Sequence, residues 1–269
     1  MIQLASLPPS TPAPHARFLR AAVEQLSRDG RIAGVAAGGS MVTGAMDEFS
    51  DLDLIIAASS DYEALLRERH EIAASLGPLL ASFTGEHVLE PRLLICLYDG
   101  AQPLHVDLKF IALADAATRV EDPLVLWERD GLLTQALLQG IACYPAPDRQ
   151  WIEDRFWVWV HYTATKIGRG EFLETVGALA NLRSMVLGPL ALARAGARPS
   201  GVRKLEQLAF NEVELLRPTV SGLSRAECIA ALKAAVEAYR AFRSDDSAVV
   251  LREAAEVASM KYLARLEAS

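Results

Sequence analysis

Apolar and polar positions alternate in two different ways along the chain, and the change falls near residue 145. In the first part, short apolar runs bounded by glycine or proline stand between segments with helical spacing, which is typical of an α+β domain. Capping-box spacing of Ser60 and Glu63 predicts the start of one helix, and Asp99-Gly100 predicts a hairpin turn. The expected strands are 32–37, 52–58, 81–90, 92–98 and 104–111, and the expected helices are 15–28 and 60–75, after an extended proline-rich lead-in.

After Pro145 and Pro147 the apolar positions repeat with helical spacing only. Asp148 stands at the N-cap position of the first of these helices, and Ser224 with Glu227 has capping-box spacing before a later one. The expected helices are 149–167, 171–195, 202–216, 225–242 and 247–266. The sequence therefore predicts an N-terminal α+β domain, a mixed sheet with flanking helices, over residues 1–145. A C-terminal all-α helical bundle is expected over residues 146–269.

Composition narrows the class of protein. The chain has 27 basic and 34 acidic residues and a net charge of −7, which disfavours a broad nucleic-acid surface. No uncharged apolar run reaches about 18 residues, and no basic segment followed by an apolar stretch opens the chain, so we expect neither a membrane span nor a signal peptide. The three cysteines form no CxxC pair and are expected to be free thiols. A cytoplasmic protein is expected.

The segment that carries chemistry is Gly-Gly-Ser at residues 38–40, followed after ten residues by Asp51-Leu52-Asp53. Asp51 and Asp53 are two positions apart at a strand start, so their carboxylates leave the same face. Such a pair repels itself unless a cation is present, and hard divalent cations prefer oxygen ligands. Asp107 alternates with apolar residues on the strand 104–111 and adds a third carboxylate if that strand lies beside the first. Three carboxylates can hold two magnesium ions.

The glycines supply the other half of the site. Gly38 and Gly39 follow a buried strand and allow backbone N–H groups to approach a ligand closely, and Ser40 adds a hydroxyl donor. A phosphate cradle beside a metal site is what phosphoryl or nucleotidyl transfer requires.

The ordered combination of these residues resembles the signature of the nucleotidyltransferase superfamily that includes DNA polymerase beta. The strand His105-Val106-Asp107-Leu108 resembles the strand that carries the third carboxylate of that superfamily. Together with a C-terminal helical bundle, the chain is most similar to bacterial antibiotic nucleotidyltransferases, which include aminoglycoside adenylyltransferases and lincosamide nucleotidyltransferases. The motif resemblance covers about residues 31–111, and that of the bundle is one of architecture.

The resemblance implies roles for individual residues. Asp51, Asp53 and Asp107 would be the catalytic carboxylates and would bind Mg²⁺, while Gly38, Gly39 and Ser40 would hold the triphosphate of a nucleotide, ATP by expectation. A lysine from the helical domain commonly reaches the triphosphate in this family, and Lys166 is the expected one. The enzyme would move a nucleoside monophosphate to a hydroxyl of a small acceptor, such as an aminoglycoside-like antibiotic, and release pyrophosphate.

Two other functions stay open at this point: an adenylyltransferase that acts on a protein, and a nucleotide-binding module without catalysis. RNA is disfavoured because the basic segment 194–204 contains no aromatic residue. Lys109 either meets a phosphate or forms an ion pair with a carboxylate, and Glu86 with Glu90 would share one strand face as reserve bases. The acceptor, the nucleotide, the general base and the oligomeric state are left open.

Overall fold

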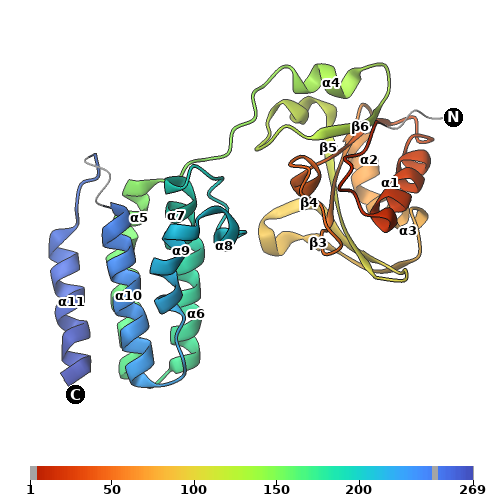
Figure 1. The fold of residues 1–269 in the computed structure, drawn as a ribbon. Coiled ribbons are helices and arrows are strands. Elements are labelled where there is room, and N and C mark those ends of the chain that lie inside the picture. The colour runs from red at the N-terminus through yellow and green to blue at the C-terminus, as the bar shows by residue number, and fades with distance from the viewer. Residues whose placement is uncertain (1–4, 244–247, 269) are drawn as a thin grey trace. The chain divides into compact units, whose positions relative to one another are not determined.

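The computed structural model describes residues 5–243 and 248–268 of the 269-residue chain. It divides into two compact units, Met1–Cys143 and Tyr144–Ser269, which we call unit 1 and unit 2 (Figure 1). Unit 1 contains a mixed sheet with flanking helices, and unit 2 is helical in its described part. This is the α+β class expected from the sequence.

The sheet of unit 1 has six strands in the order β3-β4-β5-β2-β1-β6. The strands are β1 (Ile32–Ala37), β2 (Leu52–Ala58), β3 (Leu79–Gly85), β4 (Glu90–Tyr98), β5 (Leu104–Ala112) and β6 (Leu124–Glu128). Among the strands that the structure describes, only β2 and β5 pair in parallel, and the other neighbours are antiparallel. The strands β1 and β2 have the predicted bounds, and the predicted hairpin joins β4 to β5. Sequence patterning did not predict β6.

Helices cover the two faces of the sheet unequally. The first face packs its apolar side chains against α1 (Ala13–Leu26), α2 (Tyr62–Arg67) and α3 (Arg69–Ser75). The second face is covered in part by η3 (Leu113–Ala117) and α4 (Leu132–Leu137), which pack on a smaller apolar cluster. The polar positions of β2 and β5 lie on this second face, so burial of the first face decides where they point.

Two local predictions in unit 1 are wrong. The helix α1 already begins at Ala13, with Pro14 in its first turn, because the fixed φ of proline suits that position and its missing N–H costs nothing there. The capping box of Ser60 and Glu63 does not form: Asp61 is the N-cap and makes no side-chain cap bond. The predicted helix 60–75 is also divided at Glu68, between α2 and α3.

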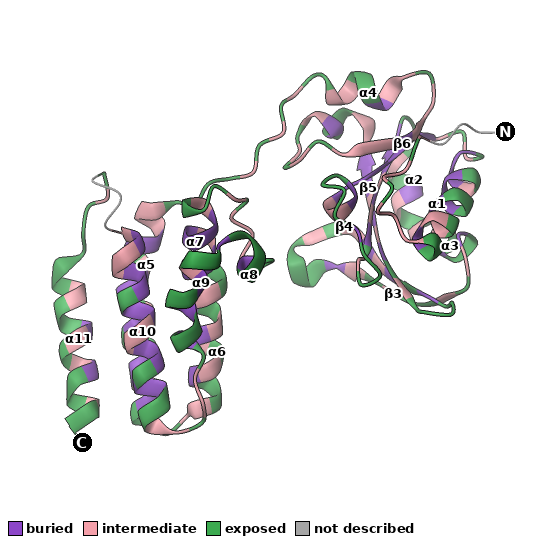
Figure 2. Ribbon diagram, viewed as in Figure 1, coloured by how far each residue is buried: buried purple, intermediate pink, exposed green. Residues whose placement is uncertain are grey.

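Unit 2 is built from helices whose apolar sides meet in one core, seen as buried stripes in Figure 2. They are α5 (Arg149–Gly168), α6 (Phe172–Leu182), α7 (Gly188–Arg194), α8 (Leu205–Leu208), α9 (Phe210–Leu216), α10 (Arg225–Arg243) and α11 (Glu253–Ala268). The side chain of Asp148 accepts the Trp151 N–H at 2.9 Å, which confirms the predicted N-cap. The capping box of Ser224 and Glu227 also forms, with both backbone N–H groups bonded to the partner side chain.

The predicted helix 171–195 is continuous, but its middle, Arg183–Leu187, is a π-helical turn. Pro189 explains the irregularity, because proline cannot donate the hydrogen bond that an α-helix requires at its position. The stretch Phe172–Arg194 is long and apolar enough to cross a membrane by length and composition alone. In the structure, Leu179, Leu182 and Val186 of this stretch pack in the core of unit 2.

The other helices of unit 2 depart from prediction at their ends. The predicted helix 202–216 is broken at Ala209, between α8 and α9. The last helix was expected to start at Ser247, which lies outside the described residues, and α11 begins at Glu253.

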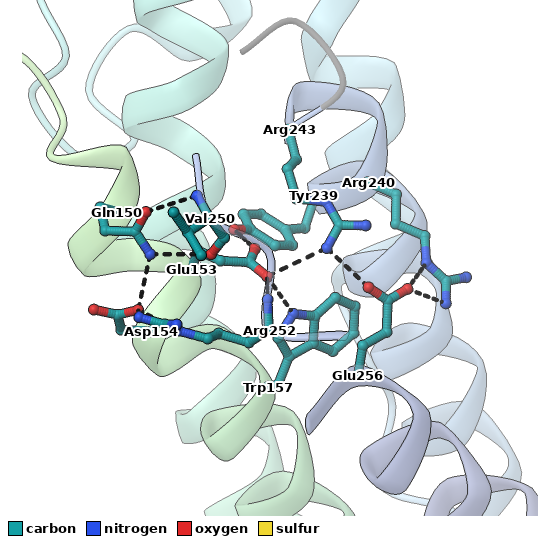
Figure 3. A network of polar contacts seen from close by, with 10 residues as sticks. All are labelled: Gln150, Glu153, Asp154, Trp157, Tyr239, Arg240, Arg243, Val250, Arg252 and Glu256. Atoms are coloured by element: carbon teal, nitrogen blue, oxygen red, sulfur yellow. Dashed lines mark hydrogen bonds and ion pairs between the residues drawn. The ribbon is translucent and has the colours of Figure 1, made fainter. Parts of the chain in front are cut away.

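A buried carboxylate ties α11 to the rest of unit 2 (Figure 3). Glu153 of α5 is fully buried and accepts the backbone N–H of Arg252 at 2.8 Å and the indole N–H of Trp157 at 3.1 Å. The Tyr239 hydroxyl donates to its other oxygen, and Arg243 bridges it to Glu256. Burial raises the pKa of Glu153, but these donors outweigh burial and leave the pKa below its ordinary value.

Candidate active site

The centre of the candidate site is a pair of carboxylates on neighbouring parallel strands. Asp53 of β2 stands directly opposite Asp107 of β5 in the sheet register. Their strand neighbours Leu54 and Leu108 are buried in the core, so the alternation of the strands places both aspartates on the other face, where both are half-buried. The predicted condition, that the strand of Asp107 lies beside that of Asp53, is therefore met.

Asp51 precedes β2 and is exposed. It lines an open groove of about 600 Å³ on unit 1, together with residues that include His15, Glu48, Phe49 and His105. Within residues 5–243 and 248–268, no three His, Cys, Asp or Glu side chains stand close enough together to hold a metal ion. The structure thus brings Asp53 and Asp107 together, while Asp51 stands at the groove beside them.

The donor set suits a hard cation. Every carboxylate in question offers oxygen ligands, and two of them face each other across adjacent strands. The Nε2 atom of His105 lies 2.9 Å from Oδ1 of Asp107, and the imidazole is half-exposed at the groove. His105 is therefore the polar partner of Asp107 that lies toward the groove.

The Gly-Gly-Ser turn, residues 38–40, wraps around Asp53. The Gly38 N–H donates to the backbone oxygen of Asp53 at 2.9 Å, which fastens the end of β1 to the start of β2. Gly39 has a φ of +61°, and a Cβ atom at this position would stand 2.2 Å from Oδ2 of Asp53. Glycine is required here for both reasons. Ser40 follows in the short 3-10 helix η1 (Gly39–Met41) and is half-exposed.

Sequence reasoning missed one acidic residue at this turn. Oε1 of Glu121 accepts the Gly39 N–H at 2.9 Å. Glu121 precedes β6, whose Leu124 pairs antiparallel with Ala37 of β1, so the chain before β6 passes the chain after β1. The apolar, aromatic run Leu124–Trp127 was the available signal for a strand at this edge.

Two other acidic candidates are engaged elsewhere. Lys109 forms an ion pair with Glu90 at 2.8 Å, so of the two predicted roles for this lysine the structure shows the ion pair. The Arg92 guanidinium and the Lys109 ammonium beside Glu90 lower the pKa of that carboxyl to about 2, although partial burial opposes them. Glu86 was expected to share a strand face with Glu90. This prediction is wrong, because Glu86 lies in the 3-10 turn η2 (Glu86–Val88).

Lys166 lies on α5 in unit 2. Its ammonium is 2.8 Å from Oε2 of Glu171 and 5.1 Å from the ring centre of Tyr162. Its contact with a triphosphate stays a prediction.

Comparison with known protein families indicates the class of domain that contains this site. Residues 19–83 match the family model of the nucleotidyltransferase domain, a segment that contains the Gly-Gly-Ser turn and Asp53 but ends before Asp107. A search of curated proteins gives no significant match. Unit 1 thus carries a nucleotidyltransferase domain. This match supports nucleotidyl transfer as the activity of the chain.

Solved structures similar to the chain include two proteins of low identity. One is an aminoglycoside 6-adenyltransferase from Bacillus subtilis, with 17% identity over 94% of this chain and 98% of that chain, and a TM-score of 0.39. Another is a nucleotidyltransferase-like protein from Exiguobacterium sibiricum 255-15, with 14% identity over 84% of this chain and 74% of that chain, and a TM-score of 0.37.

Proposed function

We propose that the chain is a Mg²⁺-dependent nucleotidyltransferase that moves a nucleoside monophosphate, AMP from ATP, to a hydroxyl of a small cationic molecule. The observation that carries this proposal is the register pair of Asp53 and Asp107, with the Gly-Gly-Ser turn in contact with Asp53. Carboxylates that face a backbone cradle at one point of a sheet suit a metal-bound triphosphate.

Each residue at the site has a role in this proposal. Asp53 and Asp107 would hold Mg²⁺, with Asp51 at the groove beside them, and the ion when bound neutralises triphosphate charge and positions the reacting oxygens. The Gly39 N–H would bind a triphosphate oxygen with the Ser40 hydroxyl, while Gly38 holds the turn to β2, and the ammonium of Lys166 would add a cation.

The bond changes follow from these positions. The acceptor oxygen forms a bond to the α-phosphorus while the bond between that phosphorus and the bridging oxygen to the β-phosphate breaks. Pyrophosphate leaves with the electrons of the broken bond. Asp107 takes the proton of the acceptor hydroxyl, and the hydrogen bond from His105 orients the carboxylate for this transfer.

The groove beside Asp51 suggests the acceptor. Its volume of about 600 Å³ is that of a small-molecule site rather than a macromolecular surface. Glu48 and Asp51 line it with negative charge, and the ring of Phe49 is 82% exposed and available for stacking. An amino-substituted, hydroxylated molecule such as an aminoglycoside suits this lining. The protein would then be a cytoplasmic enzyme that inactivates such an antibiotic.

The test is a pyrophosphate-release assay on the full chain, with Mg²⁺, each of the four ribonucleoside triphosphates, and a panel of aminoglycosides and lincosamides. The Asp53→Asn variant should abolish release. The matched control is Asp99→Asn in the hairpin turn, which removes the same charge and keeps an acceptor for the Gly100 N–H.

Release that needs one acceptor and vanishes in Asp53→Asn supports the proposal. Magnesium-dependent nucleotide binding without release would instead indicate a protein acceptor or a binding module without catalysis. If the full chain binds no nucleotide, the proposed site is wrong.

A further inference from the structure

The backbone donor that the proposed function assigns to the triphosphate already holds an anion of the chain itself. Oε1 of Glu121 accepts the Gly39 N–H at 2.9 Å. A Cβ atom on Gly38 would stand 3.0 Å from this same oxygen. One carboxylate oxygen therefore accepts the Gly39 N–H and fills the space beside Gly38, at the place where the proposed function puts a phosphate oxygen.

The loop that carries Glu121 is held in position. The pairing of Ala37 with Leu124 brings it to the end of β1. The guanidinium of Arg119 donates to the Asp122 side chain at 2.7 Å and to the backbone oxygen of Gly140 at 3.1 Å. The sheet and the contacts of Arg119 thus hold the loop backbone beside the turn, within reach of the Glu121 side chain.

A triphosphate bound as proposed and the Glu121 carboxylate would compete for the Gly39 N–H. Glu121 and Asp53 both lie close to the position that a Cβ atom on Gly38 would take. That position is 3.0 Å from Oε1 of Glu121 and 3.7 Å from Cβ of Asp53. A phosphate oxygen that took the Gly39 N–H would meet the Glu121 carboxylate at close range. Like charges at such a separation repel, and they repel more strongly in a partly buried site than in water.

We propose that Glu121 is an intramolecular competitor of the nucleotide: its carboxylate must leave the Gly39 N–H before the triphosphate binds there. This inference rests on the proposed function, which places the triphosphate on the Gly-Gly-Ser turn. Glu121 keeps the turn in its binding conformation while no nucleotide is present, and its charge lowers the affinity for the triphosphate. A carboxylate that served as an additional metal ligand would have the opposite effect.

The experiment measures binding of ATP with Mg²⁺ to the full chain by isothermal titration calorimetry. Glu121→Gln keeps an oxygen that can accept the Gly39 N–H but removes the charge. We expect the dissociation constant to fall about three- to tenfold. The matched control is Glu128→Gln, which removes a charge from β6, the strand that follows Glu121, where the carboxylate accepts the Thr134 N–H instead. This control should stay within about twofold of the unchanged chain.

The outcomes separate the two proposals. Tighter binding in Glu121→Gln supports the competitor role. If the unchanged chain binds ATP and the variant binds it equally or more weakly, the competitor role is wrong while the nucleotide site stands. If neither protein binds a nucleoside triphosphate, both proposals fail. Thermal unfolding of each variant verifies that the fold is intact.

Discussion

Asp53 and Asp107 face each other across two parallel strands, the only parallel pair among the strands described. Their nearest sequence neighbours are buried leucines and a valine, so the core holds both carboxylates on one face. The burial of these apolar neighbours determines the face of the sheet on which each aspartate lies. A substitution at either aspartate is therefore expected to change the reaction more than the fold.

Asp107→Asn is expected to lower the rate of nucleotidyl transfer at least a hundredfold, because the neutral amide cannot accept the acceptor proton and binds a cation more weakly than a carboxylate does. The measurement is single-turnover pyrophosphate release at saturating nucleotide. Asp99→Asn should retain the original rate. A near-normal rate in Asp107→Asn would remove this residue from the catalytic set.

Gly39→Ala should abolish nucleotide binding and destabilise unit 1. The new methyl group would meet Oδ2 of Asp53 at 2.2 Å, on a residue that already has a φ of +61°. Gly44→Ala is the matched control, because Gly44 has a φ of +65° and nothing within 4 Å of an added Cβ. The control should lose about 1–2 kcal/mol of stability and keep its nucleotide affinity. Thermal unfolding and calorimetry measure both. Equal effects of the two variants would contradict the role given to Gly39.

The buried carboxylate of Glu153 predicts an acid-sensitive unit 2. The pKa of Glu153 is lowered by its hydrogen bonds against the effect of burial, so its contribution is present above the unfolded pKa of about 4.3. That contribution is lost as the pH falls below this value toward the folded pKa. Glu153→Gln should cost about 2–4 kcal/mol at pH 7 and flatten the acid limb of the stability curve.

Glu237→Gln provides the comparison for Glu153, because Glu237 is exposed and its ion pair with Arg240 lies at the surface. It should change stability by less than about 1 kcal/mol. Denaturant unfolding followed by tryptophan fluorescence reports on unit 2, where Trp157 is buried. A Glu153→Gln protein that keeps the full pH dependence would show that another group titrates.

Lys166 tests the contribution of unit 2 to nucleotide binding. If Lys166 binds the triphosphate as proposed, Lys166→Ala should weaken binding of ATP with Mg²⁺ about tenfold. Glu171→Gln is the matched variant, because it breaks the same ion pair but keeps the lysine. It should bind nucleotide at least as tightly as the unchanged chain. If both variants bind normally, Lys166 serves only its pair with Glu171.

The predicted domain ranges 1–145 and 146–269 can be tested by limited proteolysis. The structure divides into Met1–Cys143 and Tyr144–Ser269, and Ile141 in the connecting segment is 90% exposed. A protease of broad specificity should cut first within 138–148 and leave two resistant fragments, identified by mass spectrometry. First cuts inside β2 or α5 would contradict the division.

Local patterning determined much of the protein. The alternation of apolar and polar residues along β5 is enough to place Asp107 on the side opposite the core, and glycine-bounded apolar runs predicted β1 and β2 with their bounds. Cap residues such as Asp148 marked helix starts in unit 2, because a cap bonds to a backbone group three residues away. The resemblance to nucleotidyltransferases could also be recognised in the sequence, because the glycine turn and the first two aspartates are close together along the chain.

The tertiary structure decided which distant segments meet. The order β5-β2-β1-β6 sets Asp53 beside Asp107 and brings Glu121 to Gly39, across 82 positions of the chain. The pairing of β4 with β5 places Lys109 beside Glu90 rather than at an open site. Strand order and register follow from the total apolar area that both faces of a sheet bury, and that sum is distributed over the whole unit. No local repeat in the sequence carries it, which is why the contact of Glu121 with Gly39 emerged only from the fold.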